Sequence, residues 1–413
     1  MRFQRGSRHV DRPRTQYNTG IAAHPSSLVA GVRYRATSSF TGLIDMTETT
    51  LAPLSPAAPT PYQADVRAVT QVLGSASGAY SLLDQFGVID AIGLDSLEFL
   101  HNQLTNDVTH LAPDVSALGG YCSPKGRLIA SLLYWLQQGA KPGDVAPGDA
   151  APAIPGVRLL ISADIREAIQ KRLSMFVMRS KVKLSDATPA LGIIGLAALG
   201  SQAEALRTVL TQHGLSVPAH VRGRTESAAG TLIRLPDAAG AERYLLLIPR
   251  DGLAAFSEAL DATLSRIDAT TWDWLDIQSG EPRITALTQD SFVPQMINFE
   301  ALGGVNFRKG CYPGQEVVAR SQYRGTIKRR ATIAGASAAK AGDEIFDAAD
   351  PVQPCGHVIN AAPSPEGGYL CLVELKLAIS ADAQLHVGAI DGPVLSVEGL
   401  PYALPDLDIT PAR

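Results

Sequence analysis

The chain has 413 residues, of which 46% are hydrophobic, and its formal net charge is −4 at pH 7. This length predicts two or three domains, and the apolar fraction is ample for real cores. The charge excludes a polycation, so any nucleic-acid contact must come from a local patch. The four cysteines are widely spaced without a C-x-x-C pair. This spacing argues against a disulfide scaffold, a zinc site or a four-cysteine cluster site, and it favours a reducing compartment.

Residues 1–60 do not have the pattern of a folded segment. Seven arginines occur there with few acids and no apolar periodicity, and Ala-Pro repeats follow over residues 51–61. We predict a disordered extension or an over-called reading frame, with Met46 as the alternative start. A transit peptide is a further reading, although no amphipathic helix is evident. With no apolar signal region and no apolar run long enough to span a membrane, we expect a cytoplasmic protein without a membrane contact.

Residues 75–190 show the pattern of a first α+β unit. A strand is predicted over 86–92, and a helix follows it with Asp95 and Glu98 as a capping box. This helix ends near Asn106 and Asp107, which form either a terminating turn or part of a pocket wall. Strands are predicted over 128–135 and 157–162 on either side of an exposed loop at 138–156. A helix over 164–176 and a strand over 181–184 complete the unit.

Residues 191–330 show the same alternation of strands and helices. Strands are predicted over 192–196, 232–235 and 244–249. Helices are predicted over 202–213, between a capping box at Ser201 and a stop at Gly214, and over 252–265. This order favours an α+β plait over a doubly wound sheet, and no nucleotide-binding fingerprint occurs. Short strands after residue 334 predict a small antiparallel barrel with Cys355 and Cys371 in its core or turns.

The segment 307–320 has the composition of a reactive site. Cys311 follows Arg308 and Lys309, and Gly310 and Gly314 require a tight turn around it. Cations close to a thiol favour the thiolate, the nucleophilic form. The alternative is a buried, inert cysteine, since free cysteine is among the most buried residue types.

A basic strip extends this segment to residue 330. It contains seven cations and a single acid, Glu316, so it carries +6. Such a run is usually a solvated face, which we expect for 328–330. The alternative is an anion site for the glutamate tail of a folate, a phosphate or an RNA backbone.

The sequence K-G-C-Y-P-G-Q-E at 309–316 resembles the K-G-C-Y-x-G-Q-E signature of the YgfZ-type folate-binding proteins. These proteins are relatives of the glycine-cleavage T-protein and of mitochondrial iron–sulfur assembly factors. Residues 292–304 and 93–108 resemble further motifs of the same family, and the resemblance covers roughly residues 80 to 401.

The resemblance implies an α+β, T-protein-like fold with two plait-like folate-binding units, at 75–190 and 191–330, and a C-terminal antiparallel β-barrel at 331–405. It also implies tetrahydrofolate, or a one-carbon derivative of it, as the cofactor. Trp272 falls where the family uses tryptophan at the folate pocket, although core packing is an alternative, and Phe86 replaces a second pocket tryptophan. The candidate catalytic residues are Cys311, Lys309 and Glu316. The candidate cofactor-binding residues are Trp272, Phe86, Asn106, Asp107, Gln315, Tyr312 and Arg320, and we expect no metal site.

One departure from the T-protein pattern bears on function. The T-protein needs a carboxylate at a position that aligns here with Ala130 and Ser131. We therefore predict folate binding without glycine cleavage, and whether the chain is an enzyme is left open. The favoured function is assembly or repair of iron–sulfur clusters, in contact with cluster proteins or assembly factors and in indirect support of tRNA methylthiolation. The alternatives are a one-carbon transferase and an RNA-binding module that uses the basic strip, and we do not expect direct nucleic-acid binding.

Overall fold

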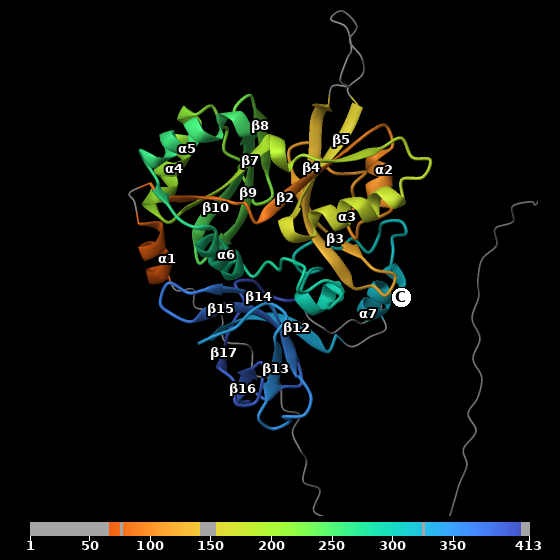
Figure 1. The fold of residues 1–413 in the computed structure, drawn as a ribbon, viewed down its shortest axis with the longest axis vertical. Coiled ribbons are helices and arrows are strands. Elements are labelled where there is room, and N and C mark those ends of the chain that lie inside the picture. Colours follow the sequence, from red (N-terminus) through yellow and green to blue (C-terminus); the bar gives the residue numbers. More distant parts are fainter. Residues whose placement is uncertain (1–65, 75–76, 141–153, 324–326, 406–413) are drawn as a thin grey trace, which may run out of the picture. The chain divides into compact units, whose positions relative to one another are not determined.

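A computed structural model describes residues 66–74, 77–140, 154–323 and 327–405 (Figure 1). The predictions for residues 1–60, for a start at Met46 and for most of the 138–156 loop lie outside these ranges. Within the described ranges, the helices are all too short or too polar to cross a membrane.

The first sheet has five strands in the order β3-β4-β5-β2-β6. β2 (Phe86–Ile92), predicted over the same residues, pairs antiparallel with both β5 (Ile154–Ser162) and β6 (Lys183–Asp186). β3 (Ser116–Cys122) and β4 (Leu128–Ala140) complete it as an antiparallel hairpin. The central residues of β2 are buried because helix α3 (Ala163–Met175) contacts this strand and supplies Ile165, Ile169 and Leu173 to the core.

The helix predicted to begin at Asp95 is α2 (Ser96–His101), and the predicted capping box is wrong. The Asp95 side chain makes no cap hydrogen bond and instead accepts from the backbone N–H of Lys181 at 2.6 Å. The carboxylate therefore joins α2 to the start of the β6 segment.

The second sheet has six strands, which are β11 (Ser265–Arg266), β1 (Ala79–Leu82), β7 (Leu191–Ala198), β10 (Ala241–Pro249), β9 (Gly230–Ala238) and β8 (Arg224–Ser227), in that spatial order. β1 comes from the range of the first predicted unit but pairs with β7 of the second. Helices α4 (Ser201–Gln212) and α5 (Leu253–Asp261) supply buried leucines to its core. Gly214 ends α4 with φ +74°, as predicted, whereas Gly200 rather than Ser201 is the N-cap residue.

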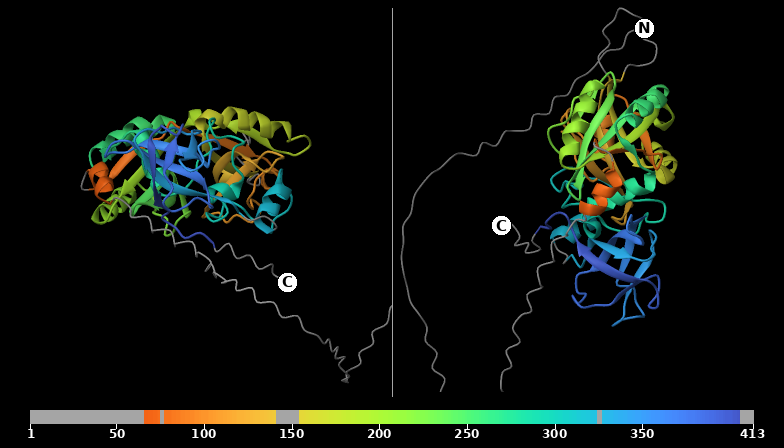
Figure 2. Two further views of the ribbon diagram at one scale, coloured as in Figure 1. Left: turned by 90° about the horizontal axis from the view of Figure 1, so that it is seen from below. Right: turned by 90° about the vertical axis from the view of Figure 1, so that its left-hand side faces the viewer.

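Six short strands close into a C-terminal barrel, as predicted. Around the barrel the order is β12 (Arg329–Ala336), β15 (Tyr369–Lys376), β14 (Gly356–Pro363), β13 (Glu344–Asp347), β16 (Leu385–Val387) and β17 (Val394–Gly399). The barrel is the blue part of the ribbon in Figure 2. Cys355 and Cys371 are buried in its core, which confirms the prediction for both.

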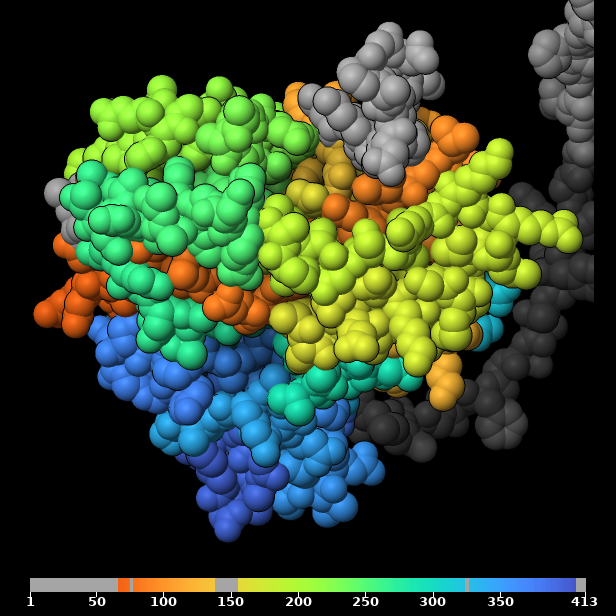
Figure 3. All heavy atoms as spheres, turned by 45° about the horizontal axis from the view of Figure 1, so that its top comes forward, coloured from red at the N-terminus to blue at the C-terminus, as the bar shows by residue number. Residues whose placement is uncertain are grey.

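The connection between the sheets and the barrel is made by α6 (Ala269–Gln278) and by residues 279–314, which form only one short helix, η3 (Pro294–Ile297). α6 contacts strands β1 and β9 on one side and β14 and β15 of the barrel on the other. In Figure 3 the blue barrel segments directly adjoin the green and yellow segments of the sheets and their helices. α1 (Val66–Leu73) adds Val69 and Leu73 to the buried core, and α7 (Gln315–Tyr323) follows the cysteine motif.

Candidate functional site

A cavity of about 450 Å³ lies where the two sheets, α6 and the barrel meet. Its apolar walls include leucines of β4, β5 and β10, and a pocket of this size is in the range that holds a small-molecule ligand. The residues that give it chemical character are Phe86, Ser131, Arg243, Trp272, Asp273, Asp276, Glu281 and Arg283.

Helix α6 supplies one wall of this cavity. The helix begins at Asp268, whose carboxylate accepts from the Thr271 backbone N–H at 2.7 Å, and this bond holds the Asp268 pKa below its usual value. Trp272 and Asp276 are four residues apart and so lie on the same face of α6, with Asp273 beside them. One turn and a half of helix thus presents an indole and two carboxylates to the cavity.

The two aromatic residues predicted for folate, Trp272 and Phe86, line this same cavity. The guanidinium carbon of Arg243 is 5.4 Å from the Trp272 ring centroid, and that of Arg283 is 4.8 Å from the Phe86 centroid. Trp272 is also 1% exposed and packs so closely on Gly195 that a Cβ there would lie 2.6 Å from the indole. Trp272 is therefore both packed in the core and part of the cavity wall.

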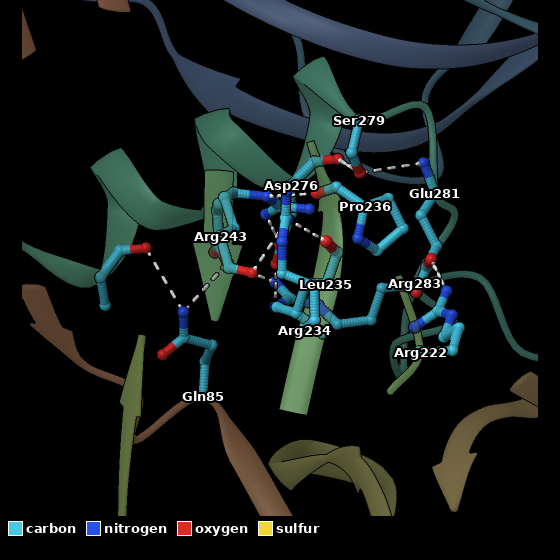
Figure 4. Close-up of polar contacts among 12 residues, drawn as sticks. Gln85, Arg222, Arg234, Leu235, Pro236, Arg243, Asp276, Ser279, Glu281 and Arg283 are labelled. Atoms are coloured by element: carbon cyan, nitrogen blue, oxygen red, sulfur yellow. Dashed lines mark hydrogen bonds and ion pairs between the residues drawn. The ribbon is translucent and has the colours of Figure 1, made fainter. Parts of the chain in front are cut away.

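Two arginine–aspartate pairs line the polar end of the cavity, and Figure 4 shows the Arg243–Asp276 pair. Arg243 Nη1 lies 2.5 Å from Asp276 Oδ1, and Arg283 Nη2 lies 2.8 Å from Asp273 Oδ1. Burial raises the pKa of Asp273, and the charge of Arg283 opposes that rise. The sequence analysis missed all four residues; the available signal was a pair of acids on the helix that carries Trp272, with an arginine shortly after it.

This polar end retains unused hydrogen-bonding capacity. Arg283 Nε, in the cavity wall, is buried and has no hydrogen-bond partner among the described residues. The Arg283 backbone is fixed by the barrel, because Asn360 accepts from its N–H at 2.9 Å and donates to its carbonyl at 2.8 Å. Buried polar atoms normally find a partner, so an unpaired donor in a cavity wall indicates a place for a polar ligand or water.

Ser131, which we expected to align with the T-protein carboxylate, lines the cavity with a neutral hydroxyl. Its Oγ accepts from the Ile284 backbone N–H at 2.9 Å, and Ala130 beside it is fully buried. A serine hydroxyl carries no negative charge, so it cannot pair with a cationic amine as a carboxylate does.

Cys311 is exposed, so the alternative of a buried, inert thiol is wrong. Its neighbour Lys309 points inward: Nζ donates to the backbone carbonyls of His101 and of Leu104, the latter at 2.9 Å. Burial lowers the Lys309 pKa to about 8, although the charges of Asp107 and Cys311 oppose this shift. The predicted cation is therefore close to the thiol, and at the same time it fastens the loop to the end of α2.

The turn around Cys311 depends on Gly314. Its φ is +78°, and a Cβ there would lie 2.4 Å from the Ser123 carbonyl oxygen. Tyr312 is buried, with Lys309 Nζ 4.8 Å from its ring centroid. Gln315, Glu316 and Arg320 follow on α7, with Glu316 and Arg320 exposed.

Asn106 and Asp107 belong with the cysteine loop rather than with the cavity. Asn106 Nδ2 donates to the carbonyls of Leu118 and Gly303, both at 2.7 Å. Burial alone would raise the Asp107 pKa, but hydrogen bonds from His110 and Thr109 hold it well below its usual range. Neither residue lines the cavity, so the structure does not bring them to Trp272 and Phe86.

The structure thus divides the predicted site into two groups. Phe86 and Trp272 line the cavity, whereas Cys311, Lys309, Tyr312, Gln315, Glu316, Arg320, Asn106 and Asp107 do not. The cavity includes Ser131 of β4, but Tyr134 of the same strand donates to the Asp107 carbonyl at 2.9 Å. Residues three apart on a strand point to opposite faces, so the first sheet separates the cavity from the Asp107 side. Figure 1 accordingly shows α6 and α7 well apart.

The basic strip is neutralised only in part, and of the face expected to be solvated at 328–330 only Lys328 is exposed. Arg329 Nη1 lies 2.8 Å from Glu374 Oε2, and Arg330, 5% exposed, pairs with the buried Glu300. Lys328 is exposed, and Arg324 lies outside the described residues. Two of the strip's cations are therefore parts of the barrel connection and are not open to an external anion.

No family model matches the chain. It is 30% identical over 329 residues to the tRNA-modifying protein YgfZ of Yersinia pseudotuberculosis serotype O:1b (strain IP 31758), covering 78% of this chain and 92% of the relative. It is 28% identical over 328 residues to the protein of the same name from Pectobacterium carotovorum subsp. carotovorum (strain PC1), covering 78% and 91%.

Among solved structures, the glycine cleavage system aminomethyltransferase T from Bartonella henselae is similar, with a TM-score of 0.63 at 16% identity over 82% of this chain and 89% of that chain. This likeness confirms the predicted T-protein-like fold.

Proposed function

This chain belongs to the YgfZ family, and from that premise we propose that it binds a reduced folate in the cavity and uses Cys311 in support of tRNA modification. The observation that carries the proposal is the pairing of Phe86 and Trp272 with two arginine–aspartate pairs around one cavity of about 450 Å³.

The donors and acceptors of this cavity match a pterin ring. A pterin presents adjacent N–H donors, which suit a carboxylate such as Asp273, and a carbonyl oxygen, which suits an arginine. Arg283 Nε supplies an unused donor at the same end. Phe86 offers the flat apolar surface that the ring requires. At the rim, Lys340 carries the positive charge that suits the carboxylates of the glutamate tail. When bound, the folate would supply one-carbon chemistry.

We further propose that Cys311 acts as a thiolate in the assembly or repair of iron–sulfur clusters, in contact with cluster proteins or assembly factors. Cluster enzymes that methylthiolate tRNA would then depend on it indirectly. Cys311 is exposed, which suits transfer to or from a partner protein better than chemistry inside the cavity. Glu316 and Gln315, on the first turn of α7, would orient the loop.

The second candidate, a one-carbon transferase, has one observation against it. Ser131 gives the cavity wall a neutral hydroxyl, already engaged by Ile284, where the T-protein needs a carboxylate. The RNA-binding alternative is disfavoured because Arg329 and Arg330 are ion-paired with Glu374 and Glu300.

The test combines folate titration with complementation of a strain that lacks its own family member. Cys311→Ala should bind 5-formyltetrahydrofolate as tightly as the wild type, yet fail to restore tRNA methylthiolation. Ser321→Ala, a small polar change on the neighbouring α7, should restore it fully. Restoration by Cys311→Ala would refute the thiolate role, and absence of folate binding by the wild type would refute the cavity assignment.

A further inference from the structure

His101, at the end of α2, lies directly beside the cysteine loop. The imidazole is 15% exposed, and its Nδ1 lies 3.1 Å from Asp107 Oδ1. Its other nitrogen, Nε2, faces the turn: a Cβ on Gly310 would lie 3.7 Å from it. The ring is therefore held by a carboxylate on one side and directed at the residue next to Cys311 on the other.

The loop is fastened to His101 by a second contact. Lys309 Nζ donates to the His101 carbonyl, and it is close enough to Cys311 for their charges to interact. The same ammonium also interacts with the charge of Asp107. Cys311, Lys309, His101 and Asp107 thus form one cluster of ionisable groups, from the 309–311 turn, α2 and the segment that follows it.

We propose that His101, oriented by Asp107, is the positioning base of Cys311. The proton of the thiol passes to His101 Nε2, which leaves a thiolate beside an imidazolium, and Asp107 balances the imidazolium charge. A carboxylate bonded to one ring nitrogen fixes the tautomer that leaves the other nitrogen free to accept a proton. This inference deepens the proposed function and rests on the role given there to Cys311.

The other charged groups around His101 do not replace this arrangement. Glu98 lies one turn earlier on α2, exposed to solvent. His110 also bonds Asp107, with Nδ1 2.9 Å from Oδ2, but its side chain is 84% exposed. Lys309 stabilises a thiolate but cannot accept a proton while it carries its own charge.

The experiment measures alkylation of the purified full chain by iodoacetamide from pH 5.5 to pH 9. Because Cys122, Cys355 and Cys371 are buried, the rate in the folded protein reports on Cys311. The wild type should show a rate that persists below pH 7, as expected for a thiolate–imidazolium pair. His101→Gln should slow alkylation at pH 6.5 by about tenfold or more and move the rise in rate to the alkaline pH of an ordinary thiol.

Asp107→Asn should produce the same change to a smaller extent, and it keeps the inference testable if His101→Gln does not fold. Glu98→Gln, an exposed change one turn earlier on α2, is the matched control and should leave the pH–rate profile unchanged. A profile in His101→Gln identical to that of the wild type would overturn the inference. This readout needs neither folate nor a deletion strain, so its failure is distinct from failure of the proposed function.

Discussion

The cavity and the cysteine loop contrast in how their residues are gathered. The cavity takes Phe86, Ser131, Arg243, Trp272 and Arg283 from positions nearly two hundred residues apart, and its largest side chain is 1% exposed. The loop takes its cysteine, lysine and turn glycine from six consecutive positions, with the thiol in solvent. The difference teaches that the cavity and the cysteine loop are separate parts of this protein, so each can be altered without the other.

Trp272→Ala should have the largest effect and should act on the fold. The indole is packed against Gly195 and Arg243, so its removal leaves a cavity and lowers the free energy of unfolding by about 3–5 kcal/mol. Urea denaturation measures this loss, and Phe176→Ala, an aromatic 47% exposed, should cost less than about 1 kcal/mol. Equal costs for the two variants would contradict the packing of Trp272.

Gly314→Ala should come next and should act on the loop. Alanine at φ +78° is strained by about 1–2 kcal/mol, and the close Ser123 carbonyl adds to that cost. Gly310→Ala is the matched control, because its nearest new contact is an ordinary 3.7 Å, and it should change the free energy of unfolding by less than about 0.5 kcal/mol. Folate affinity should remain that of the wild type in both variants. If Gly314→Ala stayed folded but lost folate binding, the cavity and the cysteine loop would not be independent of each other.

Arg283→Met should weaken folate binding without a change in thiol reactivity. Loss of a charged donor to the ligand costs roughly 1.5–3 kcal/mol, which is at least about tenfold in affinity. Arg266→Met serves as the control, since Arg266 also lies over an aromatic ring, that of Tyr80, but is not in the cavity wall. Calorimetric titration of both variants with 5-formyltetrahydrofolate makes the comparison. Equal affinities would show that Arg283 does not bind the folate.

Lys309 should produce the smallest effect, a pH dependence of stability. Its pKa is about 8 in the folded protein and 10.5 without perturbation, so between these values the unfolded chain binds more protons. Stability should therefore rise with pH in this window, by about 1 kcal/mol after solvent screening. The difference in unfolding free energy between wild type and Lys309→Met should grow from pH 7.5 to pH 10. A constant or falling difference would contradict the buried position of the ammonium.

Local pattern was sufficient for much of the fold. The strand Phe86–Ile92, the stop of α4 at Gly214 and the buried barrel cysteines were all predictable, because alternation, turn chemistry and apolar content act over a few residues. The two predicted capping boxes did not form. The Asp95 carboxylate bonds to Lys181, a residue distant in sequence, and α4 begins after Gly200 rather than Ser201.

The sequence by itself determined the family, the fold class and the cysteine proposed to react, because those rest on contiguous motifs. Only the tertiary structure decided that Arg243 and Arg283 meet the acids of α6, that Arg330 is buried against Glu300, and that His101 faces the thiol loop. The physical reason is that a charge alone does not specify its partner: the same arginine is a solvated surface group or half of a buried pair, depending on which distant strand or helix packs beside it.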